Sequence, residues 1–176
     1  MSKCNFGNMK DLCDVHEKGS SSFKMHDSKK VFEEIDLKKG EIALDLGCGP
    51  GDYSFEMANI VGDAGKVYSI EKDQEIVSYL NERIKKSGIK NIYTFCASIA
   101  EPLPIENESA DLCLIVTVLH IPAVSKSYDA IFTEVNRILK KGGRLITIDV
   151  KKEDASFGPP MNMRISSDEL KDIVVK

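Results

Sequence analysis

The chain has 176 residues, of which 42% are hydrophobic and 30% charged, and its formal net charge is −4. It has no signal-peptide pattern, no apolar run near the length of about 20 residues that a membrane-spanning helix needs, and no basic cluster interleaved with aromatic residues. This composition predicts one cytoplasmic domain without a membrane segment, and it speaks against a nucleic-acid partner.

The first predicted segment is a polar arm at residues 1–26, which shows no clear periodicity and which we expect to be partly disordered. The domain is then expected at 27–176, beginning with a short helix at 28–36. Three potential metal ligands lie in the arm: Cys4, Cys13 and His16. Known metal sites have much tighter ligand spacings, so we predict no metal centre. The five cysteines include no C-x-x-C pair, and a disulfide framework is not expected either.

A strand, a glycine-rich turn and a helix are predicted next. The apolar run 42–44 predicts a buried parallel strand that ends at Asp45. Three glycines follow it at the spacing G-x-G-x-G: Gly47, Gly49 and Gly51. Glycines allow a tight turn that brings bare backbone against a ligand. Because residues 52–61 have helical apolar spacing, this segment is typical of the first half of a nucleotide-binding βαβ unit.

The rest of the pattern alternates strands with helices. Strands are expected at 66–70, 91–96, 110–116 and 144–150, and helices between Asp73 and Gly88 and over 128–139, the latter closed by residues 140–143. Such alternation predicts an α/β fold, a doubly wound parallel sheet with right-handed crossovers and strand order 3-2-1-4-5.

The acids around the glycines indicate the class of ligand. Glu71 ends the second strand, twenty residues after Gly51, where it can accept hydrogen bonds from both ribose hydroxyls of a nucleotide. Position 52 is Asp where a dinucleotide fingerprint has its third glycine, and a carboxylate at a helix start would repel a pyrophosphate. Asp45 and Asp52 instead favour a positively charged ligand that has a ribose but no phosphate. S-adenosylmethionine has these properties, whereas NAD fits poorly.

Four sequence blocks stand in order between about residues 38 and 164. They are DLGCGPG at 45–51, VYSIE at 67–71, PLPIENESADLCLIVTVLH at 102–120 and EVNRILKKGGRLITID at 134–149. Through these blocks the chain resembles the class I S-adenosylmethionine-dependent methyltransferases, in particular the small type 11 or UbiE-like group. The resemblance implies a Rossmann-like fold, S-adenosylmethionine as cofactor and methyl transfer as activity.

The expected cofactor site follows from the same blocks. The glycine loop with Cys48 would wrap the methionine part of the cofactor, Glu71 would hold its ribose, and Thr117 would line the methionine pocket. Ser98 would accept from the adenine amino group while Ile99 packs on the ring. The whole expected set is Asp45, Gly47, Cys48, Gly49, Gly51, Glu71, Lys72, Ser98, Ile99 and Thr117.

The chain departs from the family pattern at two places. Relatives commonly have an Asp after the third strand, at the adenine, and the window 97–100 has no acid. Such proteins also usually continue past a helix near 166–175 into two more strands, and the sequence given ends at Lys176. The strand at 144–150 would then be an apolar edge, which invites pairing with a second copy of the chain unless residues 151–165 fold back over it.

Two further features lie where substrates would meet the cofactor. His120 follows the fourth strand and can act as a general base, or it is a structural histidine at a strand end. The stretch 157–164 combines two prolines, two methionines and Arg164, and it is either a wall of the substrate site or a connector to the last helix. In the first case Arg164 would hold an acidic substrate group, and in the second it would be a surface charge.

The expected function is methyl transfer, as the resemblance implies. No N/D-P-P-Y motif of nucleic-acid amino methyltransferases follows the fourth strand, and this favours a small-molecule acceptor. Two alternatives stay open at this point: a nicotinamide-dependent oxidoreductase and a non-catalytic module that binds S-adenosylmethionine. The identity of the acceptor does not follow from the sequence.

Overall fold

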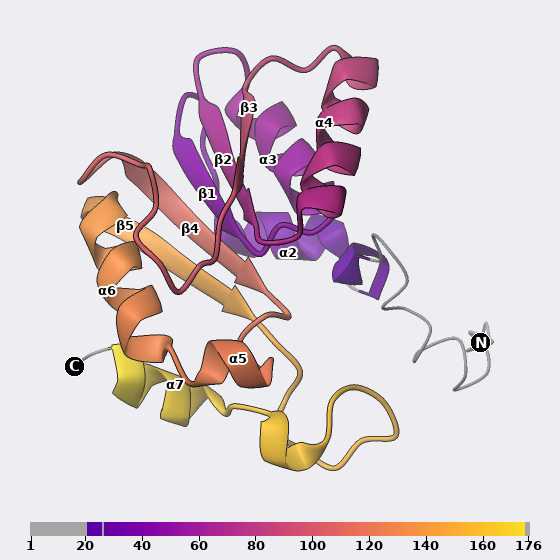
Figure 1. Ribbon diagram of the computed structural model, residues 1–176, viewed down its shortest axis with the longest axis vertical. Coiled ribbons are helices and arrows are strands. Elements are labelled where there is room, and N and C mark those ends of the chain that lie inside the picture. Colours follow the sequence, from indigo (N-terminus) through magenta and orange to yellow (C-terminus); the bar gives the residue numbers. More distant parts are fainter. Residues whose placement is uncertain (1–20, 26, 175–176) are drawn as a thin grey trace.

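The computed structural model describes residues 21–25 and 27–174. They form one five-stranded sheet with the order β3-β2-β1-β4-β5, in which all neighbouring strands are parallel (Figure 1). The strands are β1 (Ile42–Leu46), β2 (Lys66–Glu71), β3 (Ile92–Cys96), β4 (Ala110–Val116) and β5 (Leu139–Ile148). The predicted fold class and strand order are confirmed.

Helices cover both faces of this sheet. They are η2 (Ser22–Met25), α2 (Ser28–Ile35), α3 (Asp52–Val61), α4 (Gln74–Ser87), α5 (Pro122–Ser125), α6 (Tyr128–Ile138), η3 (Met161–Met163) and α7 (Ser167–Val174). None of the helices in the described part of the chain is long and apolar enough to span a membrane.

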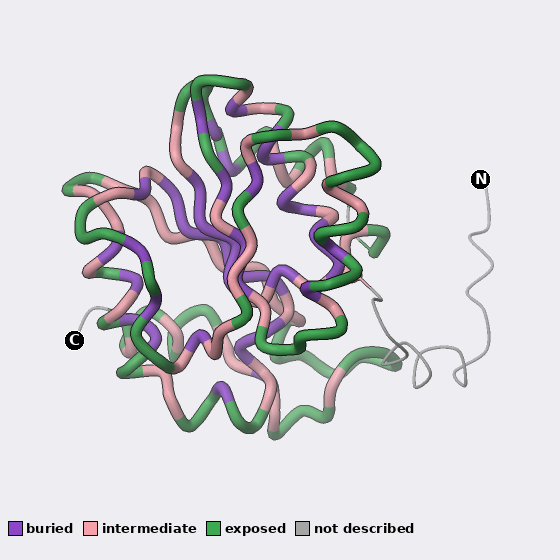
Figure 2. The backbone as a smooth tube through the Cα atoms, turned by 45° about the horizontal axis from the view of Figure 1, so that its top comes forward, coloured by how far each residue is buried: buried purple, intermediate pink, exposed green. Residues whose placement is uncertain are grey.

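The alternation of side chains along the strands divides the core into two layers. In β1, Ala43 packs with α2 and α3, whereas Leu44 and Leu46 face the layer that contains α6. In β4, Leu112 and Cys113 divide in the same way. Figure 2 shows that the buried segments gather on these central strands while the outer sides of the helices are exposed. The central strands β1 and β4 are therefore buried on both faces, as their continuous apolar sequences predict.

Local sequence signals set several helix ends. The Asp73 side chain accepts hydrogen bonds from the first-turn N–H groups of Glu75 (2.8 Å) and Ile76 (3.3 Å), and Gly88 ends α4 with a positive φ of 75°. Both ends agree with the sequence prediction, because an Asp cap and a left-handed glycine satisfy helix-end groups that would otherwise lack partners.

The start of β5 differs from the prediction. We expected residues 140–143 to close the preceding helix, but α6 ends at Ile138 and the strand begins at once with Leu139, paired with Ala110. The register then shifts, so that Leu112 pairs with Arg144 and the residues between are accommodated as an irregularity of the ladder. Gly142, with φ at 80°, takes the backbone conformation that this irregularity requires.

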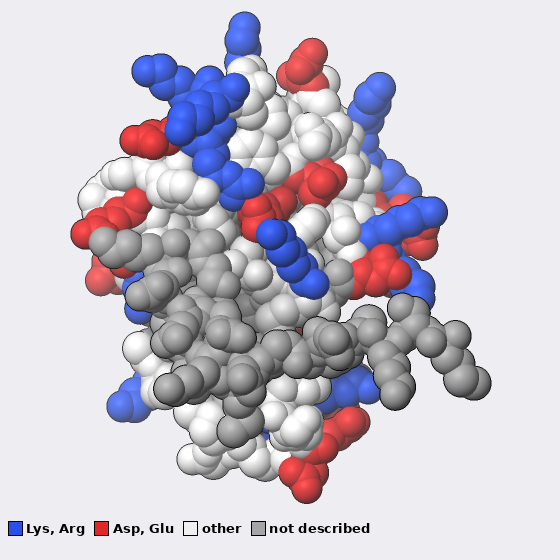
Figure 3. All heavy atoms as spheres, turned by 90° about the vertical axis from the view of Figure 1, so that its right-hand side faces the viewer, with Lys and Arg blue, Asp and Glu red and all other residues white. Residues whose placement is uncertain are grey.

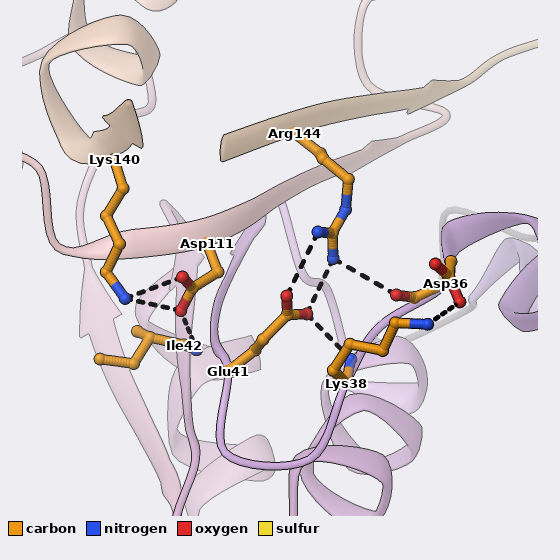
Figure 4. A network of polar contacts seen from close by, with 7 residues as sticks. All are labelled: Asp36, Lys38, Glu41, Ile42, Asp111, Lys140 and Arg144. Carbon is orange, nitrogen blue, oxygen red and sulfur yellow. Dashed lines mark hydrogen bonds and ion pairs between the residues drawn. The ribbon is translucent and has the colours of Figure 1, made fainter. Parts of the chain in front are cut away.

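Ion pairs fasten the amino end of β5 to the neighbouring strands (Figure 4). Lys140 donates to both carboxylate oxygens of Asp111 at 2.8 Å, and Asp111 also accepts from the Ile42 backbone N–H at 2.8 Å. Arg144 donates to both oxygens of Glu41, at 3.2 and 2.8 Å. These contacts join β5, β4 and β1 at the end of the sheet opposite the glycine loop, so they support the site without taking part in it.

β5 is an edge strand of the sheet, as the sequence predicts. Within the described residues β5 pairs only with β4, and residues 151–165 form no strand beside it. The segment 151–165 therefore adds no strand to the sheet at this edge, and the pairing of the edge with a second copy stays a prediction.

The described part of the N-terminal arm is attached to the domain. Residues of η2 lie over α3, with the ring of Phe23 edge-on to that of Tyr53 at 4.9 Å between centroids. The Asp27 side chain caps α2 by accepting from Lys30 N–H. The remainder of the arm, with Cys4, Cys13 and His16, lies outside the described residues.

Candidate functional site

The glycine loop is hydrogen-bonded to the carboxyl end of β2. The N–H groups of Gly47 and Cys48 both donate to the Ile70 carbonyl, at 2.9 and 3.0 Å, and Gly51 N–H donates to the Cys48 carbonyl at 3.0 Å. All three glycines have positive φ, between 54° and 89°. The loop therefore has a fixed backbone path at the carboxyl end of the sheet, where ligands of open α/β sheets bind.

The surroundings of the three glycines differ, and so does the effect that a side chain would have at each position. A Cβ on Gly47 would lie 2.6 Å from Val118, and one on Gly51 would lie 2.4 Å from Leu80, so both positions are constrained by packing. A Cβ on Gly49 would meet no atom within 4 Å. Gly49 thus borders open space beside the loop, which is the position where bare backbone can approach a ligand.

Glu71 links this loop to the next helix. Its Oε2 accepts from Gly49 N–H at 3.2 Å, and its Oε1 accepts from Asp73 N–H at 3.0 Å. Each carboxylate oxygen has a second acceptor position. The geometry fits the expected role at the ribose, because the two backbone bonds hold the carboxylate beside Gly49 while leaving capacity for two hydroxyls.

Asp45 is a buried acid beneath the loop, with 2% of its surface exposed. Its Oδ2 accepts from the Ser54 hydroxyl at 2.5 Å, and Ser54 in turn accepts from Ser69 at 2.8 Å. Burial raises the pKa of Asp45 from 3.8 to about 7, the hydrogen bond from Ser54 opposes this rise, and the nearby charge of Glu71 adds to it. A carboxyl group in this environment favours a cation beside it.

Asp52 does not act as expected. Gly51 is the residue that caps α3, and Asp52 makes an ion pair with Arg83 of α4 at 2.8 Å. Arg83 also donates to the Pro50 carbonyl at 2.6 Å. Because a guanidinium already neutralises Asp52, its charge is not directed at the ligand, and Asp45 is the acid that remains for a positive group.

The two residues expected at the adenine, Ser98 and Ile99, and the further cofactor residue Lys72 have different surroundings. Ser98 Oγ accepts from Ala100 N–H at 3.3 Å and stabilises the turn after β3. Ile99 is 8% exposed and belongs to the core layer of α6, so only its margin is available to a ring. Lys72 is exposed, next to Glu71.

A group of hydroxyls lies on the other side of the loop. Thr117 follows β4 in a left-handed conformation, with φ at 52°, and its hydroxyl donates to Ser22 of η2 at 3.0 Å. The hydroxyl of Tyr53 is buried nearby and makes no hydrogen bond with any described residue. A buried orphan hydroxyl next to two others fits the polar end of an amino-acid ligand, so these residues agree with a methionine part bound here.

His120 is held against the end of β5. Its Nδ1 lies 2.8 Å from Asp149 Oδ1, and the two side chains are 18% and 10% exposed. His120 also lines an open groove of about 500 Å³ between α5, α6, α7 and the segment after β5. The apolar residues of that groove include Pro122, Met163, Ile165 and Ile173. The structure thus brings His120 together with the stretch expected to form a substrate wall.

Arg164 plays neither of the two roles considered for it. It is buried, with 7% exposure, and its guanidinium donates to four backbone carbonyls at 2.6 to 3.1 Å. The carbonyls are those of Lys151, Glu153, Phe157 and Pro159. Arg164 is therefore the internal anchor of the loop 151–159, and its charge is not available to a substrate.

Replacing Glu71 tests the assignment of the ribose acid. The variant Glu71→Ala is expected to weaken binding of S-adenosylhomocysteine by about 1–3 kcal/mol, because two ribose hydroxyls lose a charged acceptor. Calorimetric titration measures this. Glu82→Ala, an exposed acid on α4, is the control and should bind like the parent. Equal affinity of the Glu71 variant and the parent would show that Glu71 is misassigned.

Sequence reasoning missed Asp149 as a site residue. The signal was present, since Asp149 ends an apolar strand in the same way as Asp45 and Glu71 do. Parallel strands place such acids at one edge of the sheet. The ion pair between Asp52 and Arg83 had no comparable signal, because it joins two helices that only the fold brings together.

Comparison with known proteins gives consistent matches. A family model described as a methyltransferase domain matches residues 37–174. The demethylmenaquinone methyltransferase of Lactococcus lactis subsp. lactis (strain IL1403) is 32% identical over 130 residues, which are 73% of this chain and 50% of that protein. The chain thus spans about half the length of the curated relatives it matches.

Solved structures agree with this match. A SAM-dependent methyltransferase from Aquifex aeolicus has a TM-score of 0.79 and 28% identity, covering 97% of this chain and 87% of that one. The [4+2]-cyclase SpnF has a TM-score of 0.71 and 23% identity, covering 91% of this chain and 59% of that one. At that identity the second likeness concerns the fold alone.

Proposed function

The chain belongs to the class I S-adenosylmethionine-dependent methyltransferases, and from this premise we propose that it transfers the methyl group of S-adenosylmethionine to a small-molecule acceptor. The single observation that carries the proposal is the open space at Gly49. It lies beside the carboxylate of Glu71, which accepts from Gly49 N–H, in the loop that follows β1 at the switch point between β1 and β4.

The residues around the loop divide the work of binding. Glu71 accepts from the ribose hydroxyls, and Asp45 faces the positive charge of the cofactor. Thr117, Ser22 and Tyr53 offer hydroxyls to the amino-acid end. When bound, the cofactor supplies a methyl group on a sulfonium, which is already a strong methyl donor. The chain's own contribution to rate is then chiefly placement of the acceptor in line with that methyl group.

The acceptor belongs in the groove lined by His120. The groove combines the apolar residues Pro122, Met163, Ile165 and Ile173 with polar and charged ones, and such a lining suits a small molecule that has an apolar body and a polar group. The Lactococcus relative is named for a quinone, demethylmenaquinone, and this supports an acceptor of similar character. Figure 3 shows Lys and Arg interspersed with Asp and Glu on the face it displays, rather than the single-sign patch that nucleic-acid binding requires.

His120 is the general base in this proposal. An acceptor that carries a proton must lose it as the methyl group is transferred, and a histidine within reach can take that proton. Asn162 and Ser125 also line the groove and can orient the acceptor by hydrogen bonds.

Two titrations and one assay test the function. The full chain is titrated calorimetrically with S-adenosylhomocysteine and, side by side, with NADH; tighter binding of NADH would favour the oxidoreductase instead. Radiolabelled S-adenosylmethionine is then incubated with phenol, 1,4-naphthohydroquinone and aniline. Methylation of one acceptor supports the proposal, whereas S-adenosylhomocysteine binding without any transfer favours a non-catalytic module. A cytoplasmic location belongs to the same proposal, because S-adenosylmethionine is an intracellular metabolite.

We also propose that two copies of the chain pair through the outer edge of β5. The strand presents unpaired backbone groups on that side within the described residues, and such an edge is a template for association. Light scattering is expected to give the mass of a dimer. A hydrogen-exchange measurement is expected to show slow exchange of the β5 backbone amides. The other edge strand, β3, serves as the internal control. A monomer with rapidly exchanging β5 amides would contradict the proposal.

A further inference from the structure

Three donors converge on the carboxylate of Asp149. Its Oδ1 lies 2.8 Å from His120 Nδ1 and accepts from Val150 N–H, also at 2.8 Å. Its Oδ2 accepts from Leu119 N–H at 3.1 Å. Backbone N–H groups of the segment after β4 and of the segment after β5 therefore fix the orientation of this carboxylate.

This fixed carboxylate determines which nitrogen of His120 carries the proton. An ionised carboxylate only accepts, so Nδ1 must be the donor in the 2.8 Å contact. A neutral imidazole has one N–H, and its other nitrogen is an acceptor. Nε2, on the opposite edge of the ring, is then the atom with a lone pair for a proton.

Neighbouring elements hold the rest of the residue. The Tyr128 hydroxyl of α6 donates to the Leu119 carbonyl at 2.7 Å, which fixes the peptide before His120. The other charges at the groove are already engaged: Lys152 pairs with Glu169 of α7 at 2.5 Å, and Arg164 is bonded to backbone carbonyls. Asp149 is therefore the acid in direct contact with the imidazole.

We propose that Asp149 is a positioning residue that holds His120 with Nε2 available to the groove, and that the groove accordingly takes an acceptor whose attacking atom carries a proton, such as a phenol or a hydroquinone. The inference rests on the proposed function. The acceptor oxygen forms its bond to the methyl carbon with its own electron pair, and the pair of the broken carbon–sulfur bond stays on sulfur. The acceptor proton passes to Nε2, while Nδ1–H stays on Asp149. The imidazolium then releases one proton to solvent.

The first test is the tautomer of His120 in the parent protein, which needs no acceptor. Long-range ¹H–¹⁵N correlation spectra at a pH where the ring is neutral distinguish the two tautomers, and a His120→Gln variant identifies the signal. Protonated Nδ1 with unprotonated Nε2 is the expected result. A proton on Nε2, or an even mixture, would overturn the proposal.

Matched variants distinguish a specific effect of Asp149 on the His120 ring from a general loss of structure around it. Asp149→Ala is expected to abolish the single tautomer, because the Nδ1–H donor loses its acceptor. Tyr128→Phe removes a neighbouring hydrogen bond, and Glu169→Gln removes a groove charge; both should keep the parent tautomer. An Asp149 variant that keeps it would overturn the proposal, and if that variant fails to fold, the parent spectrum still decides.

The substrate class is tested with S-adenosylmethionine and paired acceptors. Phenol and 1,4-naphthohydroquinone carry the proton, whereas dimethyl sulfide does not. Methylation of the protic acceptors is expected, with turnover about a hundredfold lower in His120→Gln and KM little changed. Transfer to dimethyl sulfide alone would overturn the inferred class. If no acceptor is methylated while the tautomer is as expected, the proposed function fails and the positioning role of Asp149 stands.

Discussion

A Gly49→Val variant is expected to fold and to bind S-adenosylhomocysteine about a hundredfold more weakly than the parent, or worse, a loss of about 2.8 kcal/mol. The added side chain meets no protein atom, since an ideal Cβ on Gly49 has nothing within 4 Å. It would instead occupy the open space beside Glu71 that we assign to the cofactor. Calorimetric titration measures the loss.

Gly88→Val is the matched control for this substitution. Gly88 also has a positive φ, 75°, and an equally open Cβ position, but it ends α4 away from the loop. Both variants carry the strain of a side chain in the left-handed region, about 1–2 kcal/mol, so their melting temperatures should fall alike. Only Gly49→Val should lose binding. A folded Gly49→Val protein with parental affinity would sink the assignment of the loop.

An Asp45→Asn variant is expected to be more stable than the parent above pH 7 while binding the cofactor more weakly. The parent must ionise a buried carboxyl whose pKa burial raises from 3.8 to about 7. The amide keeps the shape and can still accept from Ser54, but it carries no charge. Loss of a charged partner for the cofactor's ammonium should weaken binding about 10- to 100-fold.

The sign of the pH dependence follows from this shift. Between about pH 4 and pH 7 the folded parent holds a proton on Asp45 that the unfolded chain has released, so parental stability falls as pH rises through this range. The full effect is of the order of 4 kcal/mol and is constant above pH 7. Urea unfolding at pH 5 and pH 8 measures it, and the advantage of Asp45→Asn should appear at pH 8.

Asp111→Asn provides the opposite case. Burial pushes the pKa of Asp111 upward, but the hydrogen bond from Ile42 and the contacts with Lys140 outweigh it and lower the pKa. The ionised form therefore stabilises the fold, and Asp111→Asn should destabilise it at both pH values. If Asp45→Asn and the parent differ equally at pH 5 and pH 8, the buried carboxyl does not carry the pH dependence.

The sheet and the glycine loop could be predicted because their signals are local. The continuous apolar sequence of β4 indicates a strand that is buried on both faces. The spacing of Gly47, Gly49 and Gly51 alone predicts a tight turn. Even so, spacing did not separate their roles. The contacts of Val118 and Leu80, residues distant in sequence, make Gly47 and Gly51 packing positions and leave Gly49 open.

The remaining features depend on partners that the sequence does not place together. Asp52 was expected to face the ligand, and its charge is taken by Arg83 from the following helix. The start of β5 was misplaced because Lys140 and Gly142 resemble a helix end, whereas Asp111 on β4 draws the lysine into the sheet. Both differences from the prediction arise from ion pairs between separate helices and strands. Such pairs cannot be predicted from helical periodicity or from the composition of turns.

The internal anchor Arg164 has a consequence for how this protein can change. The path of the loop 151–159 is fixed by bonds to its carbonyls, which every residue type possesses, so the loop's shape depends little on its side chains. The side chains of Phe157 and Met161 take no part in those bonds, and the two residues are 52% and 42% exposed. Substitutions of these two side chains can therefore change the outer surface of the segment after β5 while the path of its backbone stays as it is.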